Sequence, residues 1–348
     1  MSNTVKKILA FSLCAALFCG GAVLYRRNVA HKKTVDTTFA MSTTITQTLY
    51  GKHAASAISA VNTAFRAFEE RLSLFSPDSE IAAINAGSGS PVAVSAATYD
   101  LLQRSLALSA TSKGAFDLTI APLTLLWGVT TDHPRVPAQA EIDAVLPLID
   151  DGAVTLGANN TVRLAPGQAI DLGGIAKGNA CSLAKDIYEE YGITSAVLNI
   201  GGNVYIKGRN PNGNRFRVGF RDPSGGESSW IASVELEDEV LAVSGGYERY
   251  FEENGVRYCH IMNGKTGYPV NSDILSVGVI TPDGTLADFM STTLYVWGEA
   301  KTRDYMQQQD AVSVLLLTAD NTLYVSKALE SRFALTDEAA ERYTVVFI

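Results

Sequence analysis

The chain contains few cysteine residues, four among 348. Cys14 and Cys19 lie in an apolar stretch near the N-terminus, which leaves only Cys181 and Cys259 for the rest of the sequence. Two isolated cysteines allow at most one intramolecular disulfide. The chain is therefore not a disulfide-stapled miniprotein.

Basic residues are also scarce beyond the N-terminal segment. Residues 1–33 contain six of the 28 lysines and arginines and no acid, so residues 34–348 carry 22 bases against 36 acids, a net charge of −14. An acidic body of this kind argues against nucleic acid as a partner. With 47% hydrophobic and 18% charged residues the chain can bury a large core, which excludes disorder and a collagen-like repeat.

Only one uncharged run approaches the length of a membrane-spanning helix. It comprises the eighteen residues from Ile8 to Tyr25, with lysines before it and arginines after it. The run is longer than the usual apolar core of a cleavable signal peptide, and the large Phe18 precedes Cys19, where a lipoprotein signal has a small residue. This pattern favours an uncleaved anchor over a lipidated one, so we predict that residues 1–33 are an N-terminal signal or membrane anchor.

Helices are predicted where apolar residues recur every three or four positions. Ile58 to Leu72 follow this spacing, and Ser95 can cap a helix that runs to Lys113. Shorter helices are expected near 80–87, capped by Asp78 or Ser79, and after Pro137. A further helix is expected over 286–298, with Asp288 in its first turn.

Strands are predicted in the remaining patterned segments. Residues 34–51 alternate in a way that predicts one first strand, and residues 153–165 and 312–325 each predict a hairpin. Residues 169–192 read as a short strand, a glycine pair and a helix, whereas residues 115–128, interrupted by Pro122, predict a buried irregular segment. Because no linker or repeat divides residues 34–348, we expect an α+β fold, a single elaborated domain of antiparallel sheets with packed helices.

The glycine pair within DLGGIAK, residues 171–177, is the first candidate for chemistry. It is neither a Walker loop nor a GxGxxG motif. Backbone amides at the start of the following helix can face a diphosphate, and Lys177 can reach a phosphate as a point charge. The alternative is a tight strand-to-helix turn with a lysine that faces solvent.

Asp288 and Thr292 are the second candidate. Four residues apart on a helix, they share one face and can hold a hard cation through oxygen, with Ser291 one step round. The alternative is a capping aspartate and a threonine that bonds back to the helix.

His260 is the third candidate because it alone among the four histidines lies in a patterned segment. It stands at a strand end before Asn263 and Gly264, where it can act as a base or a phosphate donor. The alternative is a half-buried histidine satisfied by backbone. A Cys259/His260 nucleophile is disfavoured because neighbouring residues of a strand face opposite ways.

Eight segments, taken in order, resemble the FAD:protein FMN transferases, the ApbE family. The resemblance covers nearly all of residues 34–348. The segments are MSTTIT (41–46), SPDSEIAAIN (76–85), GAFDLTIAPL (114–123), DLGGIAKG (171–178), LNIGGNVYIKG (198–208), VSGGYERYF (243–251), HIMNGKTGYPV (260–270) and ADFMSTTLYVWG (287–298).

The resemblance implies a flavin transferase domain over residues 34–348 that moves FMN from FAD to a Thr or Ser hydroxyl of a target protein, with Mg²⁺, and releases AMP. His260 and Asp288 are the implied catalytic residues. The implied metal ligands are Asp288, Thr292, the Gly174 carbonyl and Ser291. The implied FAD contacts are Met41, Phe75, Ala115, Phe116, Asp117, Asp171, Lys177 and Ile261.

The sequence departs from the family pattern at three places. Ser42 replaces a glycine, Phe75 replaces an aromatic residue with a hydroxyl, and Asn263–Gly264 replace Asp-Pro. None of these changes removes an implied metal ligand.

The resemblance also implies the partners and the location. Residues 109–115 do not match the family's acceptor pattern, so the expected acceptor is another protein, an extracytoplasmic flavoprotein with an FMN-binding domain. The expected location is the cell membrane, with the catalytic domain extracytoplasmic. Two other functions stay open: hydrolysis of FAD to FMN and AMP, and non-catalytic flavin binding at the surface.

Overall fold

The computed structural model describes residues 31–226 and 229–348. Its first elements are two antiparallel strands, β1 (Lys33–Ala40) and β2 (Thr43–Tyr50). The prediction of one strand over 34–51 is therefore wrong. The chain reverses at Met41 and Ser42, which both have positive φ angles, and no glycine, proline or asparagine marks that turn in the sequence.

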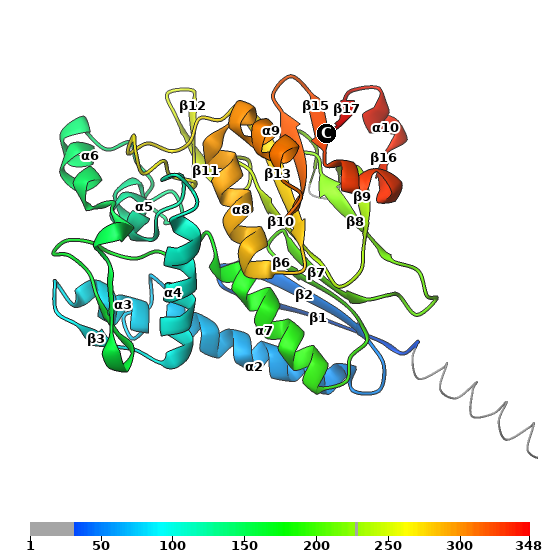
Figure 1. Cartoon of the computed structure of the whole chain (residues 1–348), viewed down its shortest axis with the longest axis horizontal. Helices are drawn as coiled ribbons and strands as arrows, with labels where there is room; N and C mark the ends of the chain where they lie inside the picture. Colours follow the sequence, from blue (N-terminus) through cyan, green and yellow to red (C-terminus); the bar gives the residue numbers. More distant parts are fainter. Residues whose placement is uncertain (1–30, 227–228) are drawn as a thin grey trace, which may run out of the picture.

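A nine-stranded sheet forms the centre of the molecule (Figure 1). Its order is β1-β2-β6-β7-β10-β13-β14-β15-β17, and among the described strands every neighbouring pair is antiparallel except β15 with β17. The further strands of this sheet are β6 (Ser195–Ile200), β7 (Asn203–Gly208), β10 (Val240–Ser244), β13 (Ile274–Thr281), β14 (Ser313–Thr318), β15 (Thr322–Val325) and β17 (Thr344–Phe347).

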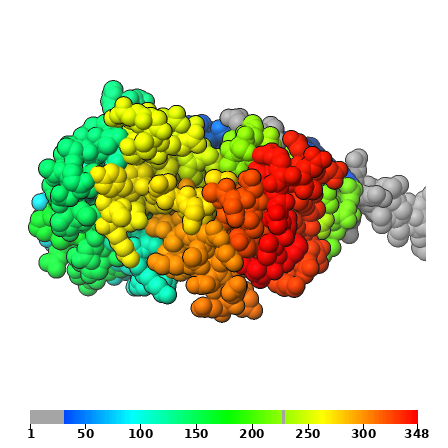
Figure 2. Space-filling view, turned by 90° about the horizontal axis from the view of Figure 1, so that it is seen from above, coloured from blue at the N-terminus to red at the C-terminus, as the bar shows by residue number. Residues whose placement is uncertain are grey.

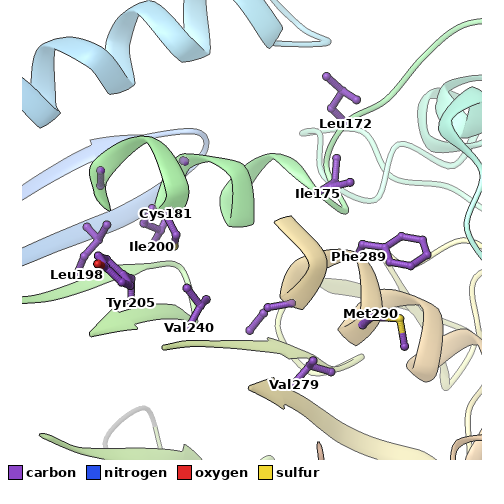
Figure 3. Packing of buried hydrophobic residues seen from close by; sticks show 14 of the residues in the cluster. Leu172, Ile175, Cys181, Leu198, Ile200, Tyr205, Val240, Val279, Phe289 and Met290 are labelled. Carbon is purple, nitrogen blue, oxygen red and sulfur yellow. The ribbon is translucent and has the colours of Figure 1, made fainter. Parts of the chain in front are cut away.

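Three helices cover one face of this sheet (Figure 1). They are α2 (Ala54–Leu72), α7 (Ala176–Glu190) and α8 (Gly284–Trp297), and α9 (Glu299–Gln308) follows α8. The largest hydrophobic core lies between these helices and the sheet. Figure 3 shows the part of it where residues of α7 and α8 meet strand residues such as Leu198 and Val279. Burial of this apolar surface is the main force that fixes α7 and α8 side by side.

The opposite face of the sheet carries a second core. There the three-stranded sheet β16-β9-β8 packs its apolar side against residues such as Leu241 and Leu315. Its elements are β8 (Phe216–Arg221), β9 (Trp230–Leu236), β16 (Phe333–Leu335) and the short helix α10 (Asp337–Ala340).

The remaining elements lie beside the central sheet. They include α3 (Glu80–Ala86), β3 (Val92–Ala93), α4 (Ala96–Ser109), α5 (Ala121–Trp127), α6 (Gln139–Val145), β4 (Thr155–Gly157), β5 (Thr161–Arg163) and the hairpin β11 (Tyr250–Glu253) and β12 (Val256–Cys259). A small third core around Trp127 joins the hairpin to α5 and α6, with the Trp127 and Tyr258 ring centroids 5.3 Å apart. Figure 2 shows the yellow hairpin region against the green residues of this part.

Two predicted helix boundaries and one predicted strand differ from the structure. The helix capped by Ser95 ends at Ser109 rather than Lys113, and no strand precedes the glycine pair at 173–174. Helix α8 begins at Gly284 with Asp283 as its cap, so Asp288 lies in the second turn rather than the first. The buried segment after residue 115 contains a short helix with Pro122 in its first turn, which proline tolerates.

The expected α+β fold is confirmed, with one parallel pair in an otherwise antiparallel central sheet. The predicted anchor from Ile8 to Tyr25 lies outside the described residues, and the division at residue 33 stays a prediction. Within residues 31–226 and 229–348, no helix is both long and apolar enough to cross a membrane.

Candidate active site

A cavity of about 300 Å³ lies where the N-terminal hairpin, the start of α7 and the end of β12 meet. It gathers all but two of the predicted site residues, although these are spread from residue 41 to residue 292. The predicted residues that line it are Met41, Phe75, Ala115, Phe116, Asp117, Asp171, Gly174, Lys177, His260, Ile261 and Thr292. Asp288 and Ser291 do not line it.

Asp288 is nevertheless fixed directly behind the cavity wall. Its residue is 2% exposed, and its Oδ2 accepts a hydrogen bond from the Gly178 backbone N–H over 2.9 Å. Gly178 on α7 and Gly284 on α8 allow this approach, because a Cβ on Gly178 would collide with the Gly284 carbonyl oxygen. The close contact between the two helices therefore determines where the Asp288 carboxylate lies.

Lys177 connects that carboxylate to the cavity. Its Nζ lies 3.5 Å from Asp288 Oδ1 and 3.5 Å from the Gly173 carbonyl oxygen. The side chain is 25% exposed. Lys177 is thus held at the cavity wall by two oxygen acceptors, which contradicts the alternative of a lysine that faces solvent.

Thr292 lies beside the glycine pair. A Cβ on Gly174 would come 3.4 Å from Thr292 Oγ1 and 2.9 Å from the Phe116 ring. The absence of a side chain at Gly174 therefore leaves a space between the Gly174 backbone and the Thr292 hydroxyl. Ser291 faces elsewhere: it is buried, its Oγ donates to the Asp288 carbonyl over 2.9 Å, and it pairs with Ser244 Oγ over 2.9 Å.

His260 lies in the cavity wall with a defined tautomer. Its Nδ1 is 3.2 Å from the Arg249 carbonyl oxygen. Since a carbonyl can only accept, Nδ1 carries the proton and Nε2 keeps its lone pair. Burial, together with the nearby positive charges of Lys177 and Arg249, lowers the pKa of His260 to about 4. The ring is therefore neutral near pH 7 and can accept a proton at Nε2.

Cys259 behaves as a core residue. It is 4% exposed, its Sγ lies 3.4 Å from the Val270 carbonyl oxygen, and burial raises the pKa of its thiol. A thiol with a raised pKa is a poor nucleophile. The structure therefore gives no support to a Cys259/His260 nucleophile.

Two aspartates in the cavity wall stabilise the loops on which they stand. Asp171 accepts from the Gly173 N–H over 2.8 Å and from Thr124 Oγ1 over 3.1 Å, and burial raises its pKa. Asp117 accepts from Thr119 N–H over 2.7 Å and from Asp151 N–H over 3.2 Å. Both carboxylates thus hold the backbone that shapes the cavity.

Apolar groups form the outer part of the cavity. Phe75 is 55% exposed at the rim, Met41 lies in the β1–β2 turn, and Phe116 packs edge-on against Phe289 with centroids 5.0 Å apart. Together with Ile261 they offer a surface on which a planar aromatic ring can pack.

A profile of the ApbE family matches residues 41–316. The chain belongs to the ApbE family. It is 31% identical over 350 residues to the FAD:protein FMN transferase of Treponema pallidum (strain Nichols), which covers 95% of each protein. It is 30% identical over 273 residues to the FAD:protein FMN transferase of Klebsiella pneumoniae (strain 342), covering 78% of this chain and 84% of that protein.

Solved ApbE structures share the fold. The ApbE protein of Thermotoga maritima MSB8 superposes with a TM-score of 0.77 at 28% identity, covering 89% of this chain and 99% of that one. The flavin transferase ApbE of Vibrio cholerae superposes with a TM-score of 0.78 at 26% identity, covering 86% and 99%. The predicted resemblance to the family is thus confirmed.

The oxygen atoms around Asp288 suit a hard cation in this ApbE-family chain. Within the described part of the chain, no three His, Cys, Asp or Glu side chains gather into a metal cluster. The donors at this place are instead a buried carboxylate, the Thr292 hydroxyl and the Gly174 backbone, a sparse oxygen set of the kind that Mg²⁺ accepts when phosphates supply further ligands. The ligand set of Asp288, Thr292 and Gly174 stays a prediction, while the Ser291 hydroxyl is bonded to Ser244 and to the Asp288 carbonyl.

Sequence reasoning missed several lining residues, including Glu69, Thr124, Glu248 and Arg249. Arg249 lies within the VSGGYERYF segment that carried the resemblance, but neither charge nor periodicity singled it out. Its contacts join segments that are 207 residues apart in sequence. Only the folded structure shows such contacts.

Proposed function

We propose that this chain is an FAD:protein FMN transferase, which moves FMN from FAD to a Thr or Ser hydroxyl of a target protein. The observation that carries the proposal is the single cavity that brings Lys177, His260, Gly174 and Thr292 together, with Asp288 directly behind. Membership of the ApbE family, whose named relatives are FMN transferases, supports the same reaction.

The reaction requires one bond to form and one to break. The acceptor hydroxyl oxygen attacks the phosphorus on the FMN side of the FAD diphosphate, the bond from that phosphorus to the AMP oxygen breaks, and a phosphodiester remains. The hydroxyl proton passes to His260 Nε2, which is unprotonated near pH 7 because the pKa of His260 is about 4. AMP leaves as the second product.

The residues at the start of α7 neutralise and orient the diphosphate. Lys177, the second residue of α7, supplies a positive charge at the helix start, where the dipole is also positive. The Gly178 N–H is engaged by Asp288 and the Ala176 N–H by the Leu172 carbonyl, so the neutralisation rests on the charge of Lys177. Because phosphoryl transfer demands little covalent chemistry from the protein, charge neutralisation and orientation account for most of the catalysis.

We place Mg²⁺ among Asp288, Thr292 and the Gly174 carbonyl. A bound Mg²⁺ supplies Lewis-acid stabilisation of the charge on the transferred phosphoryl group. Asp288 also accepts from the Gly178 N–H, and this contact orients its carboxylate before any cation binds.

The apolar rim is the place for the flavin ring. Met41, Phe75, Phe116 and Ile261 offer the packing surface, while Ala115, Asp117 and Asp171 shape the wall between the rim and the phosphate end. The proposed acceptor is an extracytoplasmic flavoprotein with an FMN-binding domain. The proposed location is the cell membrane, with residues 1–33 as the anchor.

The test is release of AMP from FAD by the full chain in detergent, with Mg²⁺ and a purified FMN-binding-domain acceptor. We expect AMP only when both the acceptor and the metal are present, and none with an acceptor whose target Thr is changed to Val. AMP release that is equal without any acceptor would show FAD hydrolysis instead. Tight FAD binding without any product would favour a binding protein.

A further inference from the structure

Arg249 makes contacts with two separate walls of the cavity. Its Nη2 donates to the Ser42 carbonyl oxygen over 2.8 Å. Its own carbonyl oxygen accepts from the His260 backbone N–H over 3.0 Å and lies 3.2 Å from His260 Nδ1. Arg249, the residue directly before β11, therefore links the β1–β2 turn to His260, the proposed base.

The β1–β2 turn that Arg249 holds has a backbone conformation that is unfavourable without supporting contacts. Met41 and Ser42 have φ angles of 52° and 56°. Residues with a Cβ rarely adopt this left-handed conformation, and it persists where surrounding contacts enforce it. The β6–β7 turn supports the same place, because Gly201 packs directly against Thr43.

The turn matters because Met41 and Ser42 both line the cavity. If the turn relaxes, the wall against which FAD packs moves. The guanidinium of Arg249 is therefore placed to control the shape of the binding site through Ser42, while its carbonyl orients the His260 ring without the guanidinium.

We propose that Arg249 is a positioning residue, whose side chain keeps the Met41–Ser42 turn in the conformation that binds FAD. This inference rests on the proposed function. It predicts that loss of the side chain weakens FAD binding but leaves turnover at saturating FAD intact, because the backbone carbonyl still orients His260.

The test compares Arg249→Met and Arg249→Lys with Arg257→Met, a control on the same hairpin whose guanidinium pairs with Glu252 outside the cavity. The measurements are the FAD dissociation constant by flavin fluorescence, and KM and kcat by AMP release. For Arg249→Met we expect Kd and KM to rise about tenfold, the size of one lost charge-assisted hydrogen bond, with kcat nearly unchanged. Arg249→Lys should recover part of the affinity, and Arg257→Met should match the wild type.

A second change separates the turn from the arginine. Glycine tolerates positive φ, so Ser42→Gly in the Arg249→Met background should restore part of the FAD affinity. Three results would overturn the proposal: an unchanged Kd in Arg249→Met, a fall in kcat at unchanged Kd, or no recovery on adding Ser42→Gly. A wild-type chain that fails to bind FAD would overturn the proposed function itself, and this inference with it.

Discussion

The backbone N–H of Gly178 donates to the Asp288 carboxylate over 2.9 Å, although 110 residues separate them. This bond exists because α7 and α8 touch at Gly178 and Gly284, where no side chain keeps the backbones apart. The position of the proposed metal ligand Asp288 is thus fixed by the packing of α8 against α7. Changes to that helix contact should therefore change catalysis.

The first prediction concerns the charge of Asp288. Asp288→Asn retains an oxygen that accepts from Gly178 but loses the charge that a cation requires. We expect the variant to fold normally and to lose transfer by at least about 100-fold, as expected when a principal electrostatic group is removed. Two quantities are measured for each variant: kcat for AMP release, and the midpoint of thermal unfolding, which shows whether the variant still folds. The control is Asp283→Asn at the N-cap of the same helix, which keeps the capping oxygen and should retain full activity. An active Asp288→Asn would remove Asp288 from the metal site.

The second prediction concerns the helix contact. Gly178→Ala would place a methyl group against the Gly284 carbonyl and 2.6 Å from Asp288 Cβ. We expect the free energy of unfolding to fall by about 1–3 kcal/mol, as in other overpacked cores, and the metal dependence of transfer to weaken. Denaturant unfolding measures the first effect. Asp186→Ala, an exposed position on α7, is the control, and equal stability of the two variants would show that α7 and α8 separate freely.

The third prediction distinguishes two neighbouring hydroxyls. Thr292 lines the cavity, whereas Ser291 is bonded to Ser244 and to the Asp288 carbonyl. Thr292→Val should raise the Mg²⁺ concentration needed for half-maximal transfer by about tenfold or more, because it removes a ligand oxygen at nearly constant volume. Ser291→Ala should change that concentration only slightly. The reverse order would make Ser291 the ligand.

The fourth prediction concerns pH. Since burial lowers the pKa of His260 from 6.5 to about 4, the free base persists through mildly acidic conditions. Transfer should therefore keep its rate down to about pH 5 and fall as the pH approaches 4. Between pH 6.5 and 4 the unfolded chain binds a proton that the native chain does not, so the free energy of unfolding decreases as the pH falls.

The pH profile of kcat/KM and an NMR titration of His260 measure these effects. His260→Gln should lose the acidic limb along with most of the rate. A limb centred near 6.5 in the wild type would contradict a half-buried base that is neutral near pH 7.

The sequence predicted the helices well because their apolar spacing reports a buried face directly, as for Ile58 to Leu72 in α2. It failed at the β1–β2 turn, where Met41 and Ser42 adopt positive φ angles that their side chains do not favour. It also placed Asp288 one turn too early, because Asp283 was not recognised as the cap. At the turn a tertiary contact overrides the local preference, whereas the Asp283 cap is a local signal, a bond from the Leu286 N–H to the Asp283 side chain, that the prediction overlooked.

At the candidate site too, the sequence predicted some features correctly and missed others. Motifs placed Lys177, His260 and Thr292 correctly at one cavity. Spacing alone could not show that Ser291 turns toward Ser244, or that Asp288 lies behind Lys177 rather than at the surface. Side-chain direction depends on packing between helices, which no local pattern encodes. Arg249 was missed for the same reason.

The central claim is that FMN passes from FAD to a protein hydroxyl. The most direct measurement is the intact mass of the acceptor together with the amount of AMP, after incubation with the full chain, FAD and Mg²⁺. We predict one FMN on each modified acceptor, at the target Thr or Ser, with an equal amount of AMP. Unmodified acceptor beside equal amounts of free FMN and AMP would contradict transfer and show that water is the acceptor.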